Sequence, residues 1–267
     1  MSTHTCPNCG ATSPADYKFC GSCGTKLSGG VSVPGAGGGM GVQKTMYFGA
    51  MQAQGRAKLV LIKGDGMDGI SYQLAGTEHV AGRSEGAILF PEDPFLSPKH
   101  ANFAYRDGLL YVQDLGSTNG IFKRIREPVE FESGTVFLVG EQLLQVEACA
   151  PDLGPQMDAD GTCFYASPKR PARMQLVQRL RGGDVGMVFR SRSDTLTIGR
   201  EGNDVNFPDD PFISGHHAKV TATTGARFQL QDMGSKNGTF LRVAHEAQLT
   251  HGDYVFLGQQ LLRVETT

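Results

Sequence analysis

Residues 82–101 read GRSEGAILFPEDPFLSPKHA, and residues 199–218, which lie 117 positions later, read GREGNDVNFPDDPFISGHHA. Further along, DLGSTNG at residues 114–120 matches DMGSKNG at residues 232–238 with an offset of 118. A period of this length is too long for a solenoid unit and fits a duplicated domain. Because the best-matched blocks are polar and rich in glycine, the duplication preserves a site as well as a core.

Short segments with alternating apolar residues lie between these blocks and predict β-strands. Turn residues separate them at regular spacing, and helix-period segments are scarce, so the sequence predicts an all-β fold of two tandem sandwiches. The expected domains cover residues 57–149 and 174–267. The clearest expected strands are 58–63, 72–74, 101–105, 110–114 and 143–147 in the first repeat, and 175–180, 187–190, 218–223, 227–232 and 261–265 in the second.

The order of the polar blocks resembles the forkhead-associated (FHA) domain family. The blocks are Gly-Arg, then Ser-x-x-His, then Gly-Ser-x-Asn-Gly, and each falls where an expected strand ends. The resemblance covers residues 57–149 and 174–267, about two thirds of the chain. It implies a β-sandwich that binds phosphothreonine peptides on the loops at one edge.

The residue types in these loops suit a phosphate ligand. An arginine guanidinium offers a planar fork of donors to two phosphate oxygens, and phosphothreonine carries nearly two negative charges. The resemblance assigns phosphopeptide binding to Arg83, Ser97, Lys99, Thr118 and Asn119 in the first repeat and to Arg200, Ser214, Gly215, Lys236 and Asn237 in the second. Asn119 and Asn237 suit the peptide main chain, whereas His100 and His217 are expected to brace the loops.

The two repeats differ at three positions of the motif. Pro98 follows the first serine and has no N–H to donate, whereas Gly215 keeps one. Lys99 is matched by His216, and Thr118 by Lys236. Both sites are expected to bind, with no ranking between them.

Four cysteines in residues 1–27 form two Cys-x-x-Cys pairs, each followed by glycine. Cys6, Cys9, Cys20 and Cys23 therefore resemble a zinc ribbon in which four thiolates enclose one structural Zn²⁺. Because a segment of 27 residues has almost no apolar core, the metal would supply its folding free energy. A pair of disulfides and a redox Cys-x-x-Cys site are the alternatives, which a reducing cytosol and the absence of a βαβ pattern disfavour.

Two connectors complete the predicted organisation. Residues 28–56 begin with SGGVSVPGAGGGMG, a glycine-rich sequence typical of a flexible linker, and residues 150–173 form a second linker without periodicity. Thr45 lies in the first linker between a basic residue and an apolar cluster, and it is a candidate phosphorylation site.

Composition limits the function. The formal net charge is −2, so no global field would attract nucleic acid. No apolar run suits secretion or a membrane span, and the sequence predicts a cytoplasmic protein. We therefore expect a non-enzymatic adaptor whose partners are phosphothreonine-containing proteins in Ser/Thr kinase signalling or regulated assembly. The alternatives are a phosphate-independent scaffold and a zinc-ribbon regulator that contacts nucleic acid. No nucleophile–base pattern indicates an enzyme.

Overall fold

The computed structural model describes residues 3–7, 10–14, 27, 57–64, 66–150, 153–168 and 170–266. The chain divides into one compact unit at residues 1–52 and another at residues 53–267. In the first unit, β1 (Thr3–Thr5) and β2 (Thr12–Pro14) form an antiparallel hairpin. Cys9, Cys20, Cys23 and Thr45 lie outside the described residues, as does the whole linker at 28–56.

The second unit is built from strands, as the sequence predicts. The first repeat contributes β3 (Ala57–Ile62), β4 (Asp68–Gln73), β5 (Glu78–Gly82), β6 (Ile88–Leu89), β7 (Ala101–Arg106), β8 (Leu109–Asp114), β9 (Ile121–Arg124), β10 (Val129–Glu132), β11 (Val136–Val139) and β12 (Gln142–Ala148). The second contributes β13 (Met174–Arg179), β14 (Val185–Ser191), β15 (Thr195–Gly199), β16 (Val205–Asn206), β17 (Ala218–Ala222), β18 (Arg227–Asp232), β19 (Thr239–Arg242), β20 (Glu246–Leu249), β21 (Tyr254–Leu257) and β22 (Gln260–Thr266). One turn of 3₁₀ helix, η1 (Arg181–Gly183), precedes β14.

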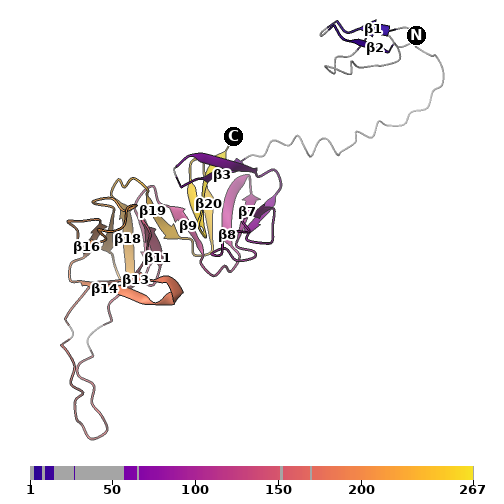
Figure 1. Cartoon of the computed structure of the whole chain (residues 1–267). Helices are drawn as coiled ribbons and strands as arrows, with labels where there is room; N and C mark the ends of the chain where they lie inside the picture. Colours follow the sequence, from indigo (N-terminus) through magenta and orange to yellow (C-terminus); the bar gives the residue numbers. More distant parts are fainter. Residues whose placement is uncertain are drawn as a thin grey trace. The chain divides into compact units, whose positions relative to one another are not determined.

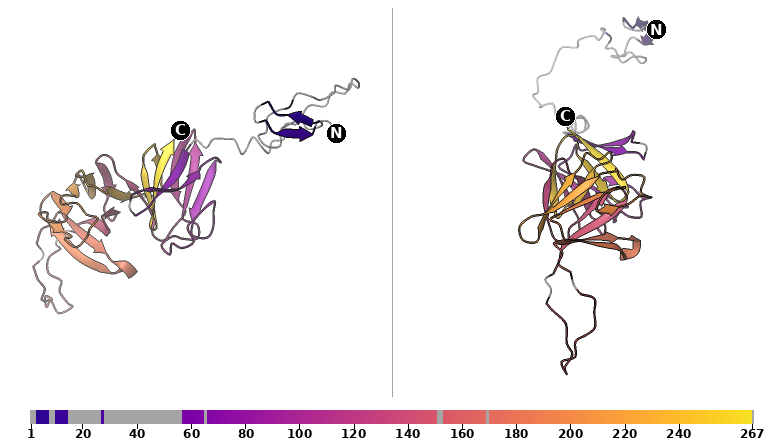
Figure 2. Two further views of the ribbon diagram at one scale, coloured as in Figure 1. Left: turned by 45° about the horizontal axis from the view of Figure 1, so that its top comes forward. Right: turned by 90° about the vertical axis from the view of Figure 1, so that its left-hand side faces the viewer.

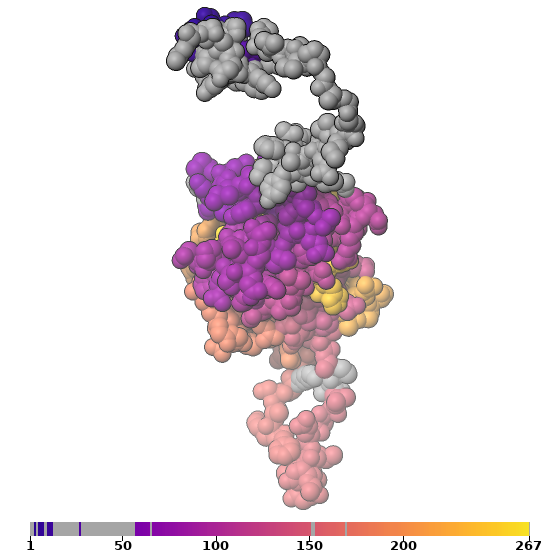
Figure 3. Space-filling view, turned by 90° about the vertical axis from the view of Figure 1, so that its right-hand side faces the viewer, coloured from indigo at the N-terminus to yellow at the C-terminus, as the bar shows by residue number. Residues whose placement is uncertain are grey.

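The two repeats exchange their last three strands. β20 pairs with β8, β21 with β9 and β22 with β3, so the end of the second repeat completes the sandwich begun by the first. Reciprocally, β10 pairs with β18, β11 with β19 and β12 with β13. Figure 1 shows the yellow strand β20 of the second repeat beside β8 of the first, while β11 of the first repeat lies beside β19 of the second. Figures 2 and 3 show the same mixing of early and late residues in one body.

We call the two resulting halves the first lobe and the second lobe. The first lobe contains residues 57–124 with β20–β22, and the second contains β10–β12 with residues 174–242. Each lobe has one five-stranded sheet of its own, in the orders β20-β8-β7-β5-β6 and β10-β18-β17-β15-β16. One ten-stranded sheet runs through both lobes, and its middle pair is β19 and β9. The compact halves therefore differ from the contiguous ranges 57–149 and 174–267 that the repeat suggests.

The two hydrophobic cores follow the lobes and not the repeats. Leu59, Phe103 and Ile121 of the first repeat pack with Val255 and Leu262 of the second. In the other core, Phe137 and Leu144 of the first repeat pack with Leu196, Val220 and Phe228 of the second. All ten of these side chains are fully buried or nearly so. Burial of this apolar surface is the main stabilising contribution to each lobe.

The segment after β9 carries the chain from one lobe to the other. A two-residue reversal directly after β9 would favour glycine, asparagine or aspartate, which readily take positive φ. Residues 125–128 read IREP, and none of them has a positive φ. Ile125 is buried in the second core, and its counterpart Val243 is buried in the first core. Pro128 also favours an extended residue before it, which suits a chain that continues into the other lobe.

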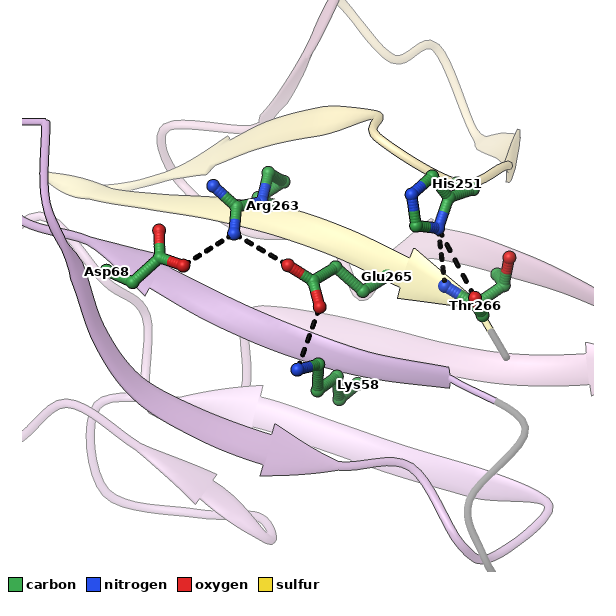
Figure 4. Close-up of polar contacts among 6 residues, drawn as sticks. All are labelled: Lys58, Asp68, His251, Arg263, Glu265 and Thr266. Carbon is green, nitrogen blue, oxygen red and sulfur yellow. Dashed lines mark hydrogen bonds and ion pairs between the residues drawn. The ribbon is translucent and has the colours of Figure 1, made fainter.

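Polar side chains link β22, the last strand, to β3 and β4 in the ten-stranded sheet. Arg263 on β22 contacts Asp68 at 2.7 Å and Glu265 at 2.6 Å, and Lys58 on β3 contacts Glu265 at 2.8 Å (Figure 4). Hydrogen bonds from Lys58 and Arg263 lower the pKa of Glu265 to about 2. The contacts join residues of the two repeats across the exchanged pairing.

The described part of the 150–173 segment contains no strand, only a bridge between Met157 and Cys163. Among the residues that the structure describes, no helix has the length and apolar character needed to cross a membrane.

Candidate functional site

The Gly-Arg turn and the serine loop are in direct contact in both lobes. The backbone N–H of Arg83 donates to the Ser97 carbonyl at 3.0 Å, and that of Arg200 donates to the Ser214 carbonyl at 3.0 Å. A Cβ at Gly82 would lie 2.9 Å from the carbonyl carbon of Pro98, so only glycine permits this approach. The glycine thus places the arginine beside the serine.

A buried histidine joins the serine loop to the asparagine-glycine turn in the first lobe. His100 is fully buried; its Nδ1 accepts from the Ser97 N–H at 3.1 Å, and its Nε2 lies 3.0 Å from the Gly120 carbonyl. Because one ring nitrogen accepts and the other donates, the imidazole is the neutral Nε2–H tautomer. The histidine thereby fixes the distance between two loops that are far apart in the sequence.

His217 makes the same bridge in the second lobe. Its Nδ1 accepts from the Ser214 N–H at 3.0 Å, and its Nε2 contacts the Gly238 carbonyl at 3.1 Å. Burial lowers the pKa of His217 and outweighs the opposing effects of the Gly238 hydrogen bond and of nearby Asp232 and Asp210. The neutral ring is therefore the form that holds the loops.

Each asparagine is held by the last residue of an FPxDPF block, which covers residues 90–95 in the first repeat and 207–212 in the second. Nδ2 of Asn119 donates to the Phe95 carbonyl at 2.7 Å, and Nδ2 of Asn237 donates to the Phe212 carbonyl at 2.7 Å. The serine hydroxyl oxygens accept from the next turn, with Ser97 Oγ 3.1 Å from the Thr118 nitrogen and Ser214 Oγ 3.1 Å from the Lys236 nitrogen. Arginine, serine and asparagine thus converge at one edge of each lobe.

Positive charge is available at both edges. In the described part of the chain, no ion pair involves Arg83, Arg200 or Lys236, and all three residues are exposed. Lys99 lies 3.4 Å from Glu85, in a pair of two exposed side chains that adds little stability. The guanidinium of Arg200 donates to the Pro211 and Ile213 carbonyls at 3.2 and 2.8 Å. Exposed positive charge therefore lies at both edges.

Pro98 and Gly215, which differ between the repeats, both anchor the serine loop through a backbone carbonyl. The Pro98 carbonyl accepts from the Glu85 N–H at 3.0 Å. The Gly215 carbonyl accepts from Nδ2 of Asn203 at 2.7 Å, and His216 contacts the same asparagine at 2.9 Å. Pro98 and Gly215 therefore anchor the serine loop through their carbonyls in both repeats.

Two buried aspartates support the sites, and the sequence reasoning did not assign them a role. Asp93 accepts from the Phe95 N–H at 2.9 Å, and it accepts from the Gln259 backbone and the Gln260 side chain at 2.8 Å each. Asp210 makes the matching set with Phe212, Glu141 and Gln142. The repeated FPxDPF block is the signal that marks them. Each aspartate links a site loop to the β-hairpin donated by the other repeat.

Two family models each match part of this chain. The FHA domain family model matches residues 79–140 and 196–258, and a domain of unknown function, DUF7577, matches residues 2–28.

Two curated relatives are similar over about a third of this chain. FHA domain-containing protein FhaB of Mycobacterium tuberculosis is 26% identical over 102 residues, which are 37% of this chain and 66% of that protein. Glycogen accumulation regulator GarA of Mycolicibacterium smegmatis is 33% identical over 91 residues, which are 33% of this chain and 57% of that protein.

One solved structure of similar sequence is the FHA domain of the CT664 protein from Chlamydia trachomatis. It is 26% identical, covers 34% of this chain and 95% of its own, and has a TM-score of 0.21. The two family matches fall on the two copies of the loop motif, and the chain therefore carries two FHA domains in tandem.

Proposed function

We propose that this protein is a non-enzymatic adaptor that binds phosphothreonine-containing proteins through two sites, one on each lobe, in Ser/Thr kinase signalling. The observation that carries the proposal is the pair of loop clusters described above. In each cluster an exposed arginine without an ion pair in the described structure lies beside a serine, and a buried histidine holds that serine's loop against an asparagine turn.

The chemistry supports a phosphate ligand more than an uncharged one. The guanidinium groups of Arg83 and Arg200 can each donate hydrogen bonds to two phosphate oxygens. The hydroxyls of Ser97 and Ser214 are further donors on shorter side chains. Each charge-assisted hydrogen bond contributes about 1.5–3 kcal/mol, and ordering the peptide opposes part of this gain. Single-site dissociation constants near the micromolar range are therefore expected.

The test is a titration of the full chain with a fluorescein-labelled phosphothreonine peptide selected from a library with random flanking residues. We expect two peptides bound per chain, one in the Arg83→Ala or the Arg200→Ala variant, and none in the double variant. Both variants should melt at the wild-type temperature because the side chains lie outside the cores. Equal binding of the unphosphorylated peptide would instead identify a phosphate-independent scaffold.

We also propose that residues 1–27 bind one structural zinc ion through Cys6, Cys9, Cys20 and Cys23. The described part of this segment supports the proposal. Cys6 is buried, Gly10 donates to its carbonyl at 3.0 Å, and its own N–H donates to the Ala11 carbonyl at 2.9 Å. Gly10 has a φ of 73°, so the chain turns tightly just after the first Cys-x-x-Cys pair. Such a turn suits two thiolates on one ion.

Native mass spectrometry of freshly purified chain tests the zinc site. We expect one zinc per molecule and its loss in the Cys20→Ser variant, while Cys163→Ser, which changes an exposed cysteine in the 150–173 segment, retains it. Metal-free wild-type protein would refute the assignment.

A further inference from the structure

The central strand pair places an arginine of each repeat against the site loop of the other. β9 and β19 run antiparallel, with Arg242 opposite Phe122 and Arg124 opposite Phe240. Both strands are four residues long and begin directly after the glycine of an asparagine-glycine turn. The arginine that ends one strand therefore lies beside the glycine that precedes the other.

The side chains follow this backbone arrangement. A Cβ at Gly120 would lie 2.9 Å from Cζ of Arg242 and 3.0 Å from its Nη2, so this guanidinium covers the glycine. A Cβ at Gly238 would lie 2.7 Å from Cζ of Arg124. Both arginines are half-buried.

The backbone closes the same junction. The Ile125 N–H donates to the Thr239 carbonyl at 2.9 Å, and the Val243 N–H donates to the Ile121 carbonyl at 2.8 Å. Each arginine is thus followed directly by a residue that is hydrogen-bonded to the other repeat. This pairing limits the positions that the guanidinium can take relative to the glycine.

The covered glycines belong to the proposed binding sites. Gly120 follows Asn119, and its carbonyl is the one that His100 holds; Gly238 and His217 stand in the same relation. The positive charge of Arg124 also acts on His217, lowering its pKa in opposition to the nearby carboxylates. Arg124 is further fixed by the Tyr254 ring, with Cζ 5.5 Å from the ring centroid.

We propose that Arg242 positions the Asn119–Gly120 turn of the first site and that Arg124 positions the Asn237–Gly238 turn of the second. Each site is then completed by an arginine from the other repeat. The inference rests on the proposed phosphothreonine binding. Neither arginine is placed in contact with the ligand; each acts through the turn that carries the asparagine.

The experiment measures each site separately in the full chain. The Arg200→Ala background leaves only the first site, and the Arg83→Ala background leaves only the second. With the labelled phosphothreonine peptide as the probe, Arg242→Ala should weaken the first site by about five- to twentyfold and leave the second unchanged. Arg124→Ala should do the reverse. Arg227→Ala, which removes an exposed arginine from β18, is the matched control and should change neither site.

Two further measurements separate positioning from folding damage. The Arg242→Ala chain should melt within about one degree of its background, and Arg242→Lys should bind within about twofold of it, because the lysine stem and charge still reach Gly120. The inference is overturned if Arg242→Ala weakens only the second site, weakens both equally or changes neither. Absence of peptide binding by the wild-type chain would instead refute the proposed function itself.

Discussion

At the scale of single residues, buried histidines connect loops that the sequence separates. His217 is fully buried and makes one hydrogen bond to each of two loops, as His100 does in the first lobe. The contact with the Ser214 loop requires the neutral ring, because a protonated Nδ1 can no longer accept the Ser214 N–H. Loop geometry in the second lobe is therefore linked to protonation.

We predict that the second lobe loses stability on acidification through His217. Burial lowers its folded-state pKa below the unfolded value of 6.5, so protons bind the unfolded chain more tightly. The contribution of the neutral ring is complete above pH 6.5 and declines as the pH falls from there through the folded-state pKa. In His217→Gln, an amide that does not titrate replaces the ring.

Thermal unfolding between about pH 7.5 and 5.5 measures this effect. The wild-type melting temperature should exceed that of His217→Gln at the higher pH, and the gap should narrow at the lower pH. The exposed His216→Gln variant is the matched surface control. A gap that stays constant across the range would rule the linkage out.

At the scale of elements, buried aspartates fasten the exchanged hairpins. Asp93 receives hydrogen bonds from its own loop and from the turn between β21 and β22, and Asp210 receives them from its loop and the turn between β11 and β12. Gly258 and Gly140 in these turns have φ values of 56° and 61°, and a side chain at either would contact the aspartate. Each of these two aspartates therefore links a loop of a proposed site to strands from the other repeat.

We expect Asp93→Ala to lower the free energy of unfolding by about 1–3 kcal/mol, because three N–H groups lose their acceptor. Asp210→Ala should lower it by a similar amount. Glu92→Ala, at an exposed position beside the first aspartate, should change it by less than about 0.5 kcal/mol. Urea unfolding gives all three free energies of unfolding. If Glu92→Ala lowered this free energy as much as Asp93→Ala, the proposed role of the aspartate hydrogen bonds would be wrong.

The strands and the loop motifs can be predicted from local sequence, whereas the contacts between the repeats cannot. Alternation and turn residues predict strands such as β7, β8 and β22 to within a residue or two, since each pattern is local. The motif order predicts that the serine, histidine and asparagine blocks are loops at one edge, and the structure brings these loops together. The cross-repeat arginines were not predicted, because their role depends on the pairing of β9 with β19.

At the scale of the whole molecule, the partner of each strand is ambiguous in the sequence. The repeats are similar, so β8 would find comparable partners in β10 of its own repeat and in β20 of the other. Pattern and register do not distinguish the two choices. The connecting segment 125–128 lacks the residues of a two-residue turn, which is compatible with exchange but does not decide it. Intramolecular exchange then joins the two FHA domains in one compact unit, and the ten-stranded sheet runs through both.

Disulfide trapping in the full chain tests the strand exchange most directly. Tyr111 on β8 lies opposite Gln248 on β20, whereas in a chain without exchange it would lie opposite Glu130, the residue that corresponds to Gln248 in the first repeat. Directly opposed strand residues lie within the Cα separation that a disulfide spans. Mild oxidation followed by peptide mapping identifies the linked cysteines, and nonreducing electrophoresis shows whether the link is within one chain. The account predicts a link within monomers of Tyr111→Cys/Gln248→Cys and none in Tyr111→Cys/Glu130→Cys; the opposite result would contradict it.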